Sequence, residues 1–397
     1  MKIFINLILL ITIIFTGCVY MGCETARPNE KEVANFINDM SVLPKNPDMV
    51  LLYYGYDTKG PRNWNTEKLK YYLAYYKDGG TESEKPVDTL FDTVLWMYRR
   101  SARGHLFESA RNFKPTKEVD WQECMDRLFV PDLQLDALEK TAVSIEKELG
   151  KPIKINVILT LPYPDTRVED WSDYLSGRSW NFYKNDKGRL KAIQWYIDAV
   201  IEKWNAAGFE HLDLIGFYWF NESHFNLRVN KEFMNDRMLD DKDIMHQTAR
   251  YLHTRKVNEH PLTCSWIPYS LYAEKRLTTA AELYHRAPMD KIDYLMLQPN
   301  YYITRWNKKK SDLISATKSA ASIMSGVEVE FDEKLVLEPE LRQRFIDYLQ
   351  VFQQYHPQLK EVPVGYYQGV QGVYEIATRT ELHSYYDALY EFIKNRK

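Results

Sequence analysis

The sequence lacks the loops and ligand spacings that mark several large enzyme classes. It contains no G-x-x-x-x-G-K-[ST] and no G-x-G-x-x-G, so it offers no loop that would cradle a phosphate or a dinucleotide. It also lacks the G-x-S-x-G of serine hydrolases and the H-E-x-x-H of zinc proteases. Only 4 cysteines are present, and no pair in the body of the chain has the spacing of a zinc site. We therefore expect neither a metal nor another cofactor.

An excess of basic charge is absent as well. Lys and Arg number 52 against 55 Asp and Glu, which gives a formal net charge of -3. Nucleic-acid-binding chains usually carry a basic excess, so we expect no nucleic-acid partner. Glycine is scarce, with 16 residues in 397, whereas aromatic side chains are plentiful, with 29 Tyr, 17 Phe and 10 Trp. Such a supply of rings suits carbohydrate, because the C–H faces of sugars stack on aromatic rings.

The N-terminal segment has the pattern of an export signal. Lys2 is followed by an apolar run, Ile3–Phe15, and then by Thr16-Gly17-Cys18. This ending resembles a bacterial lipobox, which implies that Cys18 becomes the lipid-bearing first residue of the mature chain, with Cys23 as the second candidate. The alternative is an uncleaved membrane anchor, although the run is shorter than the roughly 20 residues that span a bilayer.

We therefore expect three parts in the chain. Residues 1–22 would be a lipoprotein signal peptide and the start of a tether, 23–45 the tether, and 46–397 one folded domain. The lipid anchor would be the only membrane attachment and would place the domain at the bacterial cell envelope, on the outer membrane. Cys124 and Cys264, the cysteines of the body, are expected to be buried thiols rather than a disulfide framework. The sequence leaves the oligomeric state open.

After residue 46 the chain alternates short apolar strands with amphipathic helices eight times. Strands that are apolar on both faces and alternate with helices indicate a parallel sheet covered by helices. Eight such units favour an α/β fold of the (β/α)8 TIM-barrel type, and an open doubly wound sheet is the alternative. The first connection, over 58–88, has little helical pattern. The expected strands cover 48–57, 89–100, 152–164, 211–223, 261–270, 293–302, 326–331 and 362–368.

Polar side chains gather where these strands end, which in a TIM barrel is the face that carries the active site. Glycoside cleavage requires two carboxylates across such a mouth: one protonates the leaving oxygen, and the other attacks the sugar carbon or activates water. Glu222 at the end of strand four and Glu330 or Glu328 on strand seven are the candidate pair. The candidate substrate-binding residues are Asp57, Arg99, Trp219, Asn221, His224, Gln298, Asn300, Tyr301 and Tyr367.

Each candidate also has a purely structural interpretation. These alternatives are a helix cap for Glu222, an arginine pair for Asp57 and a place in the core for Trp219. Glu328 and Glu330 share one strand face, because side chains along a strand alternate with a period of two. Glu328 could therefore be the buried partner of Arg99 or Arg100 rather than a catalytic group.

The dipeptide Asn221-Glu222 resembles the end of strand four in clan A of the retaining glycoside hydrolases. In that clan the Glu of this pair is the acid/base, a Glu ending strand seven is the nucleophile, and a Tyr near the end of strand six often supports it. The resemblance implies these roles for Glu222, for Glu330 and for Tyr301 or its neighbour. Strand seven also carries Glu328, which leaves the nucleophile open between two glutamates.

Residues 36–393 as a whole resemble a family of bacterial lipoproteins of unknown function. That resemblance implies a barrel and an envelope location, and it brings no established substrate. The segments that carry it are Tyr54-Gly55-Tyr56, Gly216-Phe217-Tyr218-Trp219, Leu297-Gln298-Pro299-Asn300-Tyr301 and Gly326-Val327-Glu328-Val329-Glu330.

Two functional hypotheses of different class follow. The first is a retaining glycoside hydrolase that acts on a polysaccharide or glycan at the cell envelope, and the second is a non-catalytic glycan-binding surface lipoprotein. A carbohydrate is the expected partner in both, and the sugar and its linkage stay open. Retaining enzymes hold their carboxyl groups about 5 to 5.5 Å apart and inverting enzymes about 6.5 to 9.5 Å. The first hypothesis therefore predicts the shorter spacing between Glu222 and Glu330.

Overall fold

The computed structural model describes residues 29–57, 60–77, 85–109, 113–172, 180–183, 185–222, 241–268 and 274–397, the side chains of 274–276 excepted. The chain divides into two compact units, residues 1–35 and 36–397. Helix α2 (Glu30–Met40) spans this division and falls within the stretch expected to be a tether. No helix in the described residues combines the length and the apolar character needed to cross a membrane.

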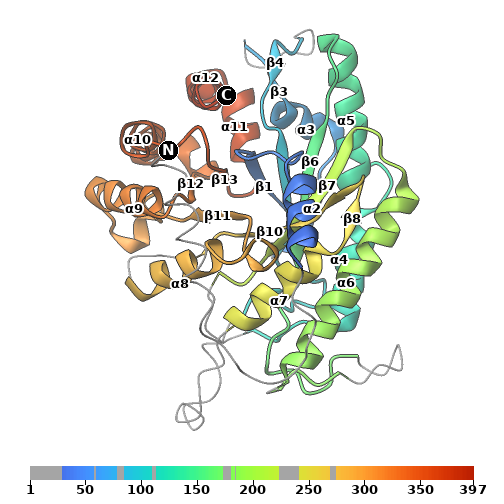
Figure 1. Cartoon of the computed structure of the whole chain (residues 1–397). Helices are drawn as coiled ribbons and strands as arrows, with labels where there is room; N and C mark the ends of the chain where they lie inside the picture. The colour runs from blue at the N-terminus through green and yellow to red at the C-terminus, as the bar shows by residue number, and fades with distance from the viewer. Residues whose placement is uncertain are drawn as a thin grey trace. The chain divides into compact units, whose positions relative to one another are not determined.

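Eight parallel strands close into a barrel, which confirms the fold predicted from the sequence (Figure 1). The strand order is β1-β5-β6-β7-β10-β11-β12-β13, and the ring closes where residues 48–50 of β1 pair with residues 364–366 of β13. A short strand, β2 (Gly60–Arg62), pairs antiparallel with the end of β1. The barrel strands are β1 (Asp48–Asp57), β5 (Thr93–Tyr98), β6 (Ile155–Leu161), β7 (Leu212–Trp219), β10 (Thr263–Trp266), β11 (Tyr294–Leu297), β12 (Gly326–Glu330) and β13 (Val364–Tyr367).

Helices surround the strands, and Figure 1 shows α5, α6, α9, α10 and α12 on the outside of the barrel. α5 (Gln134–Leu149) and α6 (Asp186–Ala207) each end at a left-handed glycine, Gly150 and Gly208, which is the residue type that most readily takes this conformation. The remaining barrel helices are α7 (Lys242–His253), α8 (Glu274–Tyr284), α9 (Lys310–Ser322), α10 (Pro339–Tyr355) and α12 (His383–Lys394).

Besides α2, three α-helices were not predicted from the sequence. α3 (Thr66–Leu73) lies in the connection that was expected to have little helix, and Asn65 caps it by accepting a hydrogen bond from the backbone N–H of Lys68. The other two are α4 (Glu118–Leu128) and α11 (Gly372–Thr378). The short elements are β3 (Ala74–Tyr75), β4 (Asp88–Thr89), β8 (Lys256–Val257), β9 (His260–Pro261) and the 3-10 helices Pro288–Asp290, Thr304–Trp306, Glu333–Val336 and Thr380–Leu382.

Glycines allow neighbouring strands of the barrel to approach closely. A Cβ atom on Gly216 would lie 2.0 Å from Thr263 Oγ1, and one on Gly326 would lie 2.0 Å from the carbonyl oxygen of Pro363. Neither position could hold a larger residue without moving the backbone. Cys124 and Cys264 are buried free thiols in this core, as the sequence predicted.

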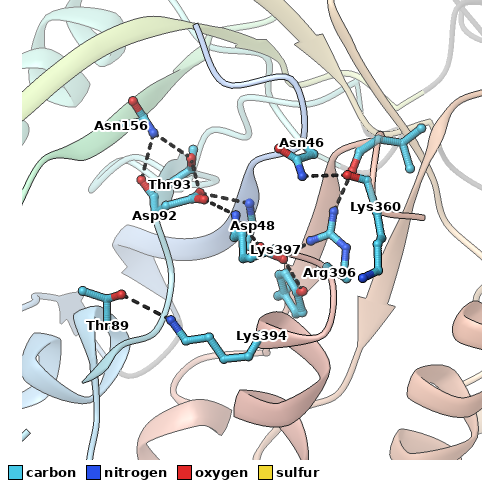
Figure 2. A network of polar contacts seen from close by, with 12 residues as sticks. Asn46, Asp48, Thr89, Asp92, Thr93, Asn156, Lys360, Lys394, Arg396 and Lys397 are labelled. Carbon is cyan, nitrogen blue, oxygen red and sulfur yellow. Dashed lines mark hydrogen bonds and ion pairs between the residues drawn. The ribbon is translucent and has the colours of Figure 1, made fainter. Parts of the chain in front are cut away.

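At the amino ends of the strands a network of charged residues joins the start of the barrel to the end of the chain (Figure 2). Asp48 is fully buried at the start of β1 and forms ion pairs with Arg396 and Lys397. The hydroxyl of Tyr366 on β13 also donates a hydrogen bond to Asp48, at 2.6 Å. Lys397 also pairs with Asp92, just before β5. The acids at this end of the barrel are therefore compensated by cations.

Candidate active site

Two of the three candidate glutamates lie on the inner face of β12. Glu328 pairs in register with Gly365 of β13, and a Cβ on Gly365 would lie 3.7 Å from Glu328 Cγ, 3.6 Å from Ile267 and 3.2 Å from Met296. These neighbours come from three barrel strands or their ends, so Glu328 faces the barrel interior. Glu330 is two residues further along the same strand and shares that face. Both glutamates are buried, with exposed fractions of 3% and 2%.

Glu222, the third candidate, follows β7 and is half-buried at the carboxyl end of the barrel. The pKa of its carboxyl is raised to about 8, first by burial and next by the charge of Glu108. A hydrogen bond from Gln298 and the charge of Arg99 lower the pKa, and Glu330 raises it by a smaller amount. Burial is therefore the main cause of the raised pKa, and the charge of Glu108 contributes more to it than the charge of Glu330.

Glu330 is held by two side-chain hydrogen-bond donors, besides the backbone of Asn300 and Tyr301. Asn300 Nδ2 donates to Oε1 at 3.0 Å, and the hydroxyl of Tyr348, from α10, donates to Oε2. Burial raises the pKa of Glu330, while the hydrogen bonds from Tyr348 and Asn300 oppose this rise. A carboxylate that accepts two hydrogen bonds is favoured in its ionised form relative to one that accepts none.

The expectation that the side chain of Tyr301 would support Glu330 was wrong, and only the backbone of Tyr301 contributes a hydrogen bond to this carboxyl. The hydroxyl of Tyr301 donates instead to Asp347 at 2.8 Å, which turns it toward α10. Arg99 is exposed and pairs with Glu108 at 2.9 Å. The tyrosine that reaches Glu330 is Tyr348, whose hydroxyl also accepts the backbone N–H of Tyr301 at 2.9 Å.

A chain of amide side chains at the end of β11 links Glu222 to Glu330. Gln298 hydrogen-bonds Glu222, and its Oε1 accepts a hydrogen bond from Asn300 Nδ2 at 3.2 Å. The same Nδ2 donates to Glu330. Asn300 has a φ of 55°, a left-handed conformation that asparagine tolerates better than most residues. Its buried Oδ1 has no hydrogen-bond partner within the described part of the chain, so it is free to accept one from a ligand.

The surroundings of Glu328 differ from those of the other two glutamates. Within the described residues no hydrogen bond reaches its carboxyl, and the pair with Arg99 that the sequence allowed does not form because Arg99 bonds Glu108. Burial, then the charges of Glu330 and Glu222, raise the pKa of Glu328 well above its ordinary range. A neutral, protonated Glu328 beside an ionised Glu330 is the arrangement expected of two coupled carboxyls.

Tyrosines line the same mouth. The rings of Tyr53 on β1 and Tyr367 on β13 meet edge to face, with centroids 6.2 Å apart. After burial and Tyr367, the charge of Glu222 contributes to the raised pKa of Tyr53. The buried Tyr218 of β7 has its pKa raised by burial, Glu222 and Glu328. Aromatic rings and carboxyl groups therefore share one region at the carboxyl ends of β1, β7, β12 and β13.

Beside the carboxyl groups lies a cleft of about 640 Å³. Its lining includes Tyr53, Arg99 and Tyr367, and each of these side chains interacts electrostatically with at least one of the three glutamates. Neither Glu222 nor Glu330 is part of its wall. The remaining lining residues are Tyr54, Tyr56, Asp57, Arg62, Arg100, Leu106, Phe113, Asp332, Glu333, Gly369, Val370 and Gln371.

Several residues predicted from the sequence to bind substrate are buried or are bonded to other groups of the protein. Trp219 is 1% exposed, so its ring belongs to the core and the predicted role as a sugar platform is corrected. Asn221 is buried, and its Oδ1 accepts the backbone N–H of Ser109 at 3.3 Å, which fixes the loop after β5. Asp57 lines the cleft and pairs with Arg62 at 2.8 Å. His224 and Cys18 lie outside the described residues.

Residues 48–391 match the family described as a domain of unknown function (DUF4855). The chain belongs to this family. No curated protein sequence matches the chain. The family description names no activity.

Solved structures that resemble the chain include several glycoside hydrolases. A psychrophilic family 10 endo-β-1,4-xylanase is 8% identical with a TM-score of 0.44, covering 89% of this chain and 98% of the xylanase. Xylanase XynB from Paenibacillus barcinonensis is 12% identical with a TM-score of 0.42, covering 84% and 90%. A family 5 enzyme from Prevotella bryantii is 12% identical with a TM-score of 0.39, covering 94% and 92%. Similarities this distant say nothing about activity, and the barrel itself is established by its strand order.

The sequence did not point to Tyr53, Tyr348 or Glu108. Tyr53 had a signal, because it lies near the carboxyl end of the first strand and two residues before Gly55, whose φ is 103°. No sequence feature at the end of a strand marks Tyr348 or Glu108. Tyr348 is one of many apolar-face residues of a helix, and Glu108 lies in a loop after β5. In the described residues no group of His, Cys, Asp and Glu has the arrangement of a metal site.

Proposed function

We propose that this protein is a retaining glycoside hydrolase that acts on a polysaccharide or glycan at the cell envelope. The observation that carries the proposal is a pair of carboxyl groups at the ends of β7 and β12, joined through Gln298 and Asn300 and placed in different surroundings. Glu222 is the acid/base and Glu330 is the nucleophile. The pair is what distinguishes an enzyme from a binding protein of the same fold.

The roles follow from the two environments. Glu222, with a pKa raised to about 8, keeps its proton at neutral pH and can give it to the glycosidic oxygen as the bond to the sugar breaks. The ionised Glu330 attacks the anomeric carbon and forms a glycosyl ester. A water molecule then gives its proton to Glu222 and attacks the same carbon, which releases the sugar and restores Glu330.

Glu330 is preferred to Glu328 as the nucleophile because of its hydrogen bonds. Tyr348 and Asn300 both donate to Glu330, whereas no hydrogen bond within the described residues reaches Glu328. Glu330 is also nearer the carboxyl end of β12, where a substrate can approach. Glu328 then holds a proton and keeps the interior of the barrel neutral.

The proposal is tested by measuring reducing-sugar release over a panel of polysaccharides with the wild-type chain and three variants. We expect turnover of at least one glycan, with the first product formed in the anomeric configuration of the substrate as seen by proton NMR. Glu222→Ala should retain activity only on aryl glycosides, whose leaving groups need no proton. Glu330→Gln should be inactive on all substrates. Glu361→Gln, an exposed glutamate at the turn before β13, is the matched control.

One observation favours the second hypothesis, a non-catalytic glycan-binding protein. The cleft of about 640 Å³ is lined by tyrosines and arginines but by neither Glu222 nor Glu330. If the wild-type chain binds a glycan, releases no sugar from any member of the panel, and binds equally well as Glu222→Gln, the binding function replaces the enzymatic one.

The envelope location and the lipid anchor are part of the proposal. They depend on Thr16-Gly17-Cys18 after an apolar run. Cys18→Ala should abolish lipid labelling and leave the signal uncleaved, whereas Cys23→Ala should be labelled as the wild type is. The opposite result would move the modified residue to Cys23.

A further inference from the structure

Three arginines line the cleft beside the glutamates, and they differ in whether an acidic side chain pairs with them. Arg62 is bonded to Asp57 at 2.8 Å. Arg99 directs two of its nitrogen atoms, Nε and Nη2, at the single oxygen Oε1 of Glu108, at 3.0 and 2.9 Å. Arg100 forms no ion pair with any residue in the part of the chain that the structure describes, and its charge is therefore available there to a ligand.

Arg100 is held in a defined place even without an acidic partner. Its carbonyl accepts the backbone N–H of Tyr56 at 3.2 Å, and its backbone forms an antiparallel bridge with Leu106. Between them the chain turns at Gly104, which has a φ of 79° and where a Cβ would lie 3.1 Å from Arg100 Nη2. A glycine therefore gives the guanidinium its room. The guanidinium lies 5.9 Å from the ring centre of Phe113, which is 43% exposed.

The turn that carries Arg100 is itself anchored in the core. His105, inside the turn, bonds the fully buried Asp120 at 2.8 Å, and the backbone N–H of Ser101 donates to the carbonyl of His105 at 3.0 Å. An arginine on such a support loses little freedom when it binds a ligand, which favours affinity.

The acids of the same cleft have local partners. Asp332 accepts a hydrogen bond from the hydroxyl of Tyr302 and another from the backbone N–H of Lys334, both at 3.0 Å. Glu333 accepts the backbone N–H of Val370 at 3.1 Å. Asp332 also pairs with Lys334 at 3.6 Å, whereas no cation pairs with Glu333 among the described residues. The wall therefore presents an unpaired cation, Arg100, at the end of β5 and an acid without a cationic partner, Glu333, after β12.

We propose that the cleft binds a negatively charged sugar unit, with its anionic group on Arg100 and the free donors of Arg99. The inference rests on the proposed carbohydrate function and names the class of glycan. A guanidinium presents paired N–H groups that match a carboxylate, sulfate or phosphate in two parallel hydrogen bonds. The rings of Phe113, Tyr53 and Tyr367 give the sugar faces to pack on.

The same geometry places the charged unit next to the bond that is cut. Tyr53 and Arg99 belong to the cleft wall, and both interact electrostatically with Glu222. A glycan chain that passes between Glu222 and Glu330 would therefore extend into the cleft with its neighbouring unit. Sugars that carry the acid group and sugars that lack it should differ in affinity by the contact with Arg100.

The test uses titration calorimetry on pairs of glycans in which the charged member carries one kind of anionic group that its partner lacks: the carboxylate in the first pair and the sulfate in the second, whose partner keeps its carboxylates. The probes are oligogalacturonate and its methyl ester, and chondroitin sulfate and its desulfated form, each with Glu330→Gln so that binding is not confused with turnover. We expect the charged member of at least one pair to bind at least about tenfold more tightly, and Arg100→Gln to remove most of that difference. Arg100→Lys, which keeps the charge without the fork, should be intermediate. Which pair responds tells a carboxylate from a sulfate.

Arg305→Gln is the control, because Arg305 also lies over an aromatic ring, Trp306, and is not part of the cleft, although it is exposed whereas Arg100 is half-buried. It should bind as the parent does. The inference is overturned if oligogalacturonate and chondroitin sulfate both bind no better than their esterified and desulfated partners, or if Arg100→Gln weakens binding no more than Arg305→Gln. If the protein cleaves only neutral glycans, and this cleavage depends on Glu222 and Glu330, the charged-glycan proposal is contradicted and the proposed hydrolase function is supported. Charge-selective binding lost in Arg100→Gln, with no cleavage of any glycan by the wild type, would support it and contradict the hydrolase.

Discussion

The two ends of the barrel treat buried acids in opposite ways. At the amino ends of the strands, Asp48 is fully buried and bonded to Arg396, Lys397 and Tyr366 (Figure 2). At the carboxyl ends, Glu328 and Glu330 are almost as deeply buried, and the groups that hydrogen-bond Glu330 there are a tyrosine and an asparagine, both neutral.

The difference shows in the proton affinities. Burial raises the pKa of all three mouth glutamates, and repulsion from the other glutamates adds to the rise for Glu222 and Glu328. A buried acid that is paired with a cation serves the stability of the fold, whereas a buried acid without one stays able to take up and release a proton near neutral pH. The buried acids at the amino ends of the strands therefore stabilise the barrel, whereas those at the carboxyl ends can exchange protons with a substrate. Four changes, taken from the largest expected effect to the smallest, would break or sharpen this contrast.

Glu330→Gln should have the largest effect, and it should act on catalysis. Loss of the nucleophile is expected to lower kcat by about 10⁴-fold or more, because the covalent step has no substitute. The melting temperature should not fall, since a buried charge is removed from a site without a cation. Steady-state kinetics and thermal unfolding on the same preparation check both points. A variant that keeps more than a tenth of the wild-type rate would move the nucleophile to Glu328.

Asp48→Ala should have the opposite signature. It leaves Arg396 buried without its partner, and breaking such a pair typically lowers the free energy of unfolding by about 3–5 kcal/mol. Denaturant unfolding measures the loss. The double variant Asp48→Ala with Arg396→Met should recover part of it, since no uncompensated charge remains. A loss below about 1 kcal/mol would show that the network at this end does little for stability.

Tyr348→Phe should reduce activity by roughly 10- to 100-fold without abolishing it, because one hydrogen bond to the nucleophile is lost. The hydroxyl lowers the pKa of Glu330, so its removal should raise that pKa. The acidic limb of the kcat/KM profile, which requires an ionised Glu330, should then shift to higher pH. Tyr355→Phe is the control, because it removes a tyrosine hydroxyl from a half-buried position at the end of the same helix, α10. An unchanged acidic limb would separate Tyr348 from the nucleophile.

Glu328→Gln should have the smallest effect, and it should depend on pH. The folded-state pKa of Glu328 is above its unfolded value, so its favourable contribution is fully present below about pH 4.5 and is lost as pH rises through the folded pKa. Each unit of that elevation corresponds to about 1.4 kcal/mol. Glutamine mimics the protonated form, and the variant should gain stability over the wild type at pH 8.5 and not at pH 4. Equal melting temperatures at both values would mean that Glu328 is not buried as a neutral acid.

The sequence predicted the barrel because its strands are apolar on both faces and its helices follow at regular intervals. Glu222, Glu328 and Glu330 could be placed at strand ends for the same reason, since the carboxyl ends of parallel strands meet at one face. The partners could not be found in this way. Tyr348 comes from α10 and Glu108 from a loop, and nothing in the local sequence separates them from other core tyrosines or loop acids. The prediction that Trp219 binds substrate was wrong for a related reason. The period of two along a strand tells which residues share a face, but it does not tell how deeply a ring is buried.

The most direct measurement is a carbon-13 NMR titration of the glutamate carboxyl groups in the free protein between pH 4 and 10. Glu222→Gln, Glu328→Gln and Glu330→Gln assign the three signals by their disappearance. The protonation states proposed here predict a midpoint near 8 for Glu222, above that of Glu330, so that at neutral pH the acid holds its proton while the nucleophile has begun to lose its own. A Glu222 signal that titrates near 4.5, with the exposed glutamates, would contradict the division between the two ends of the barrel and the acid role of Glu222.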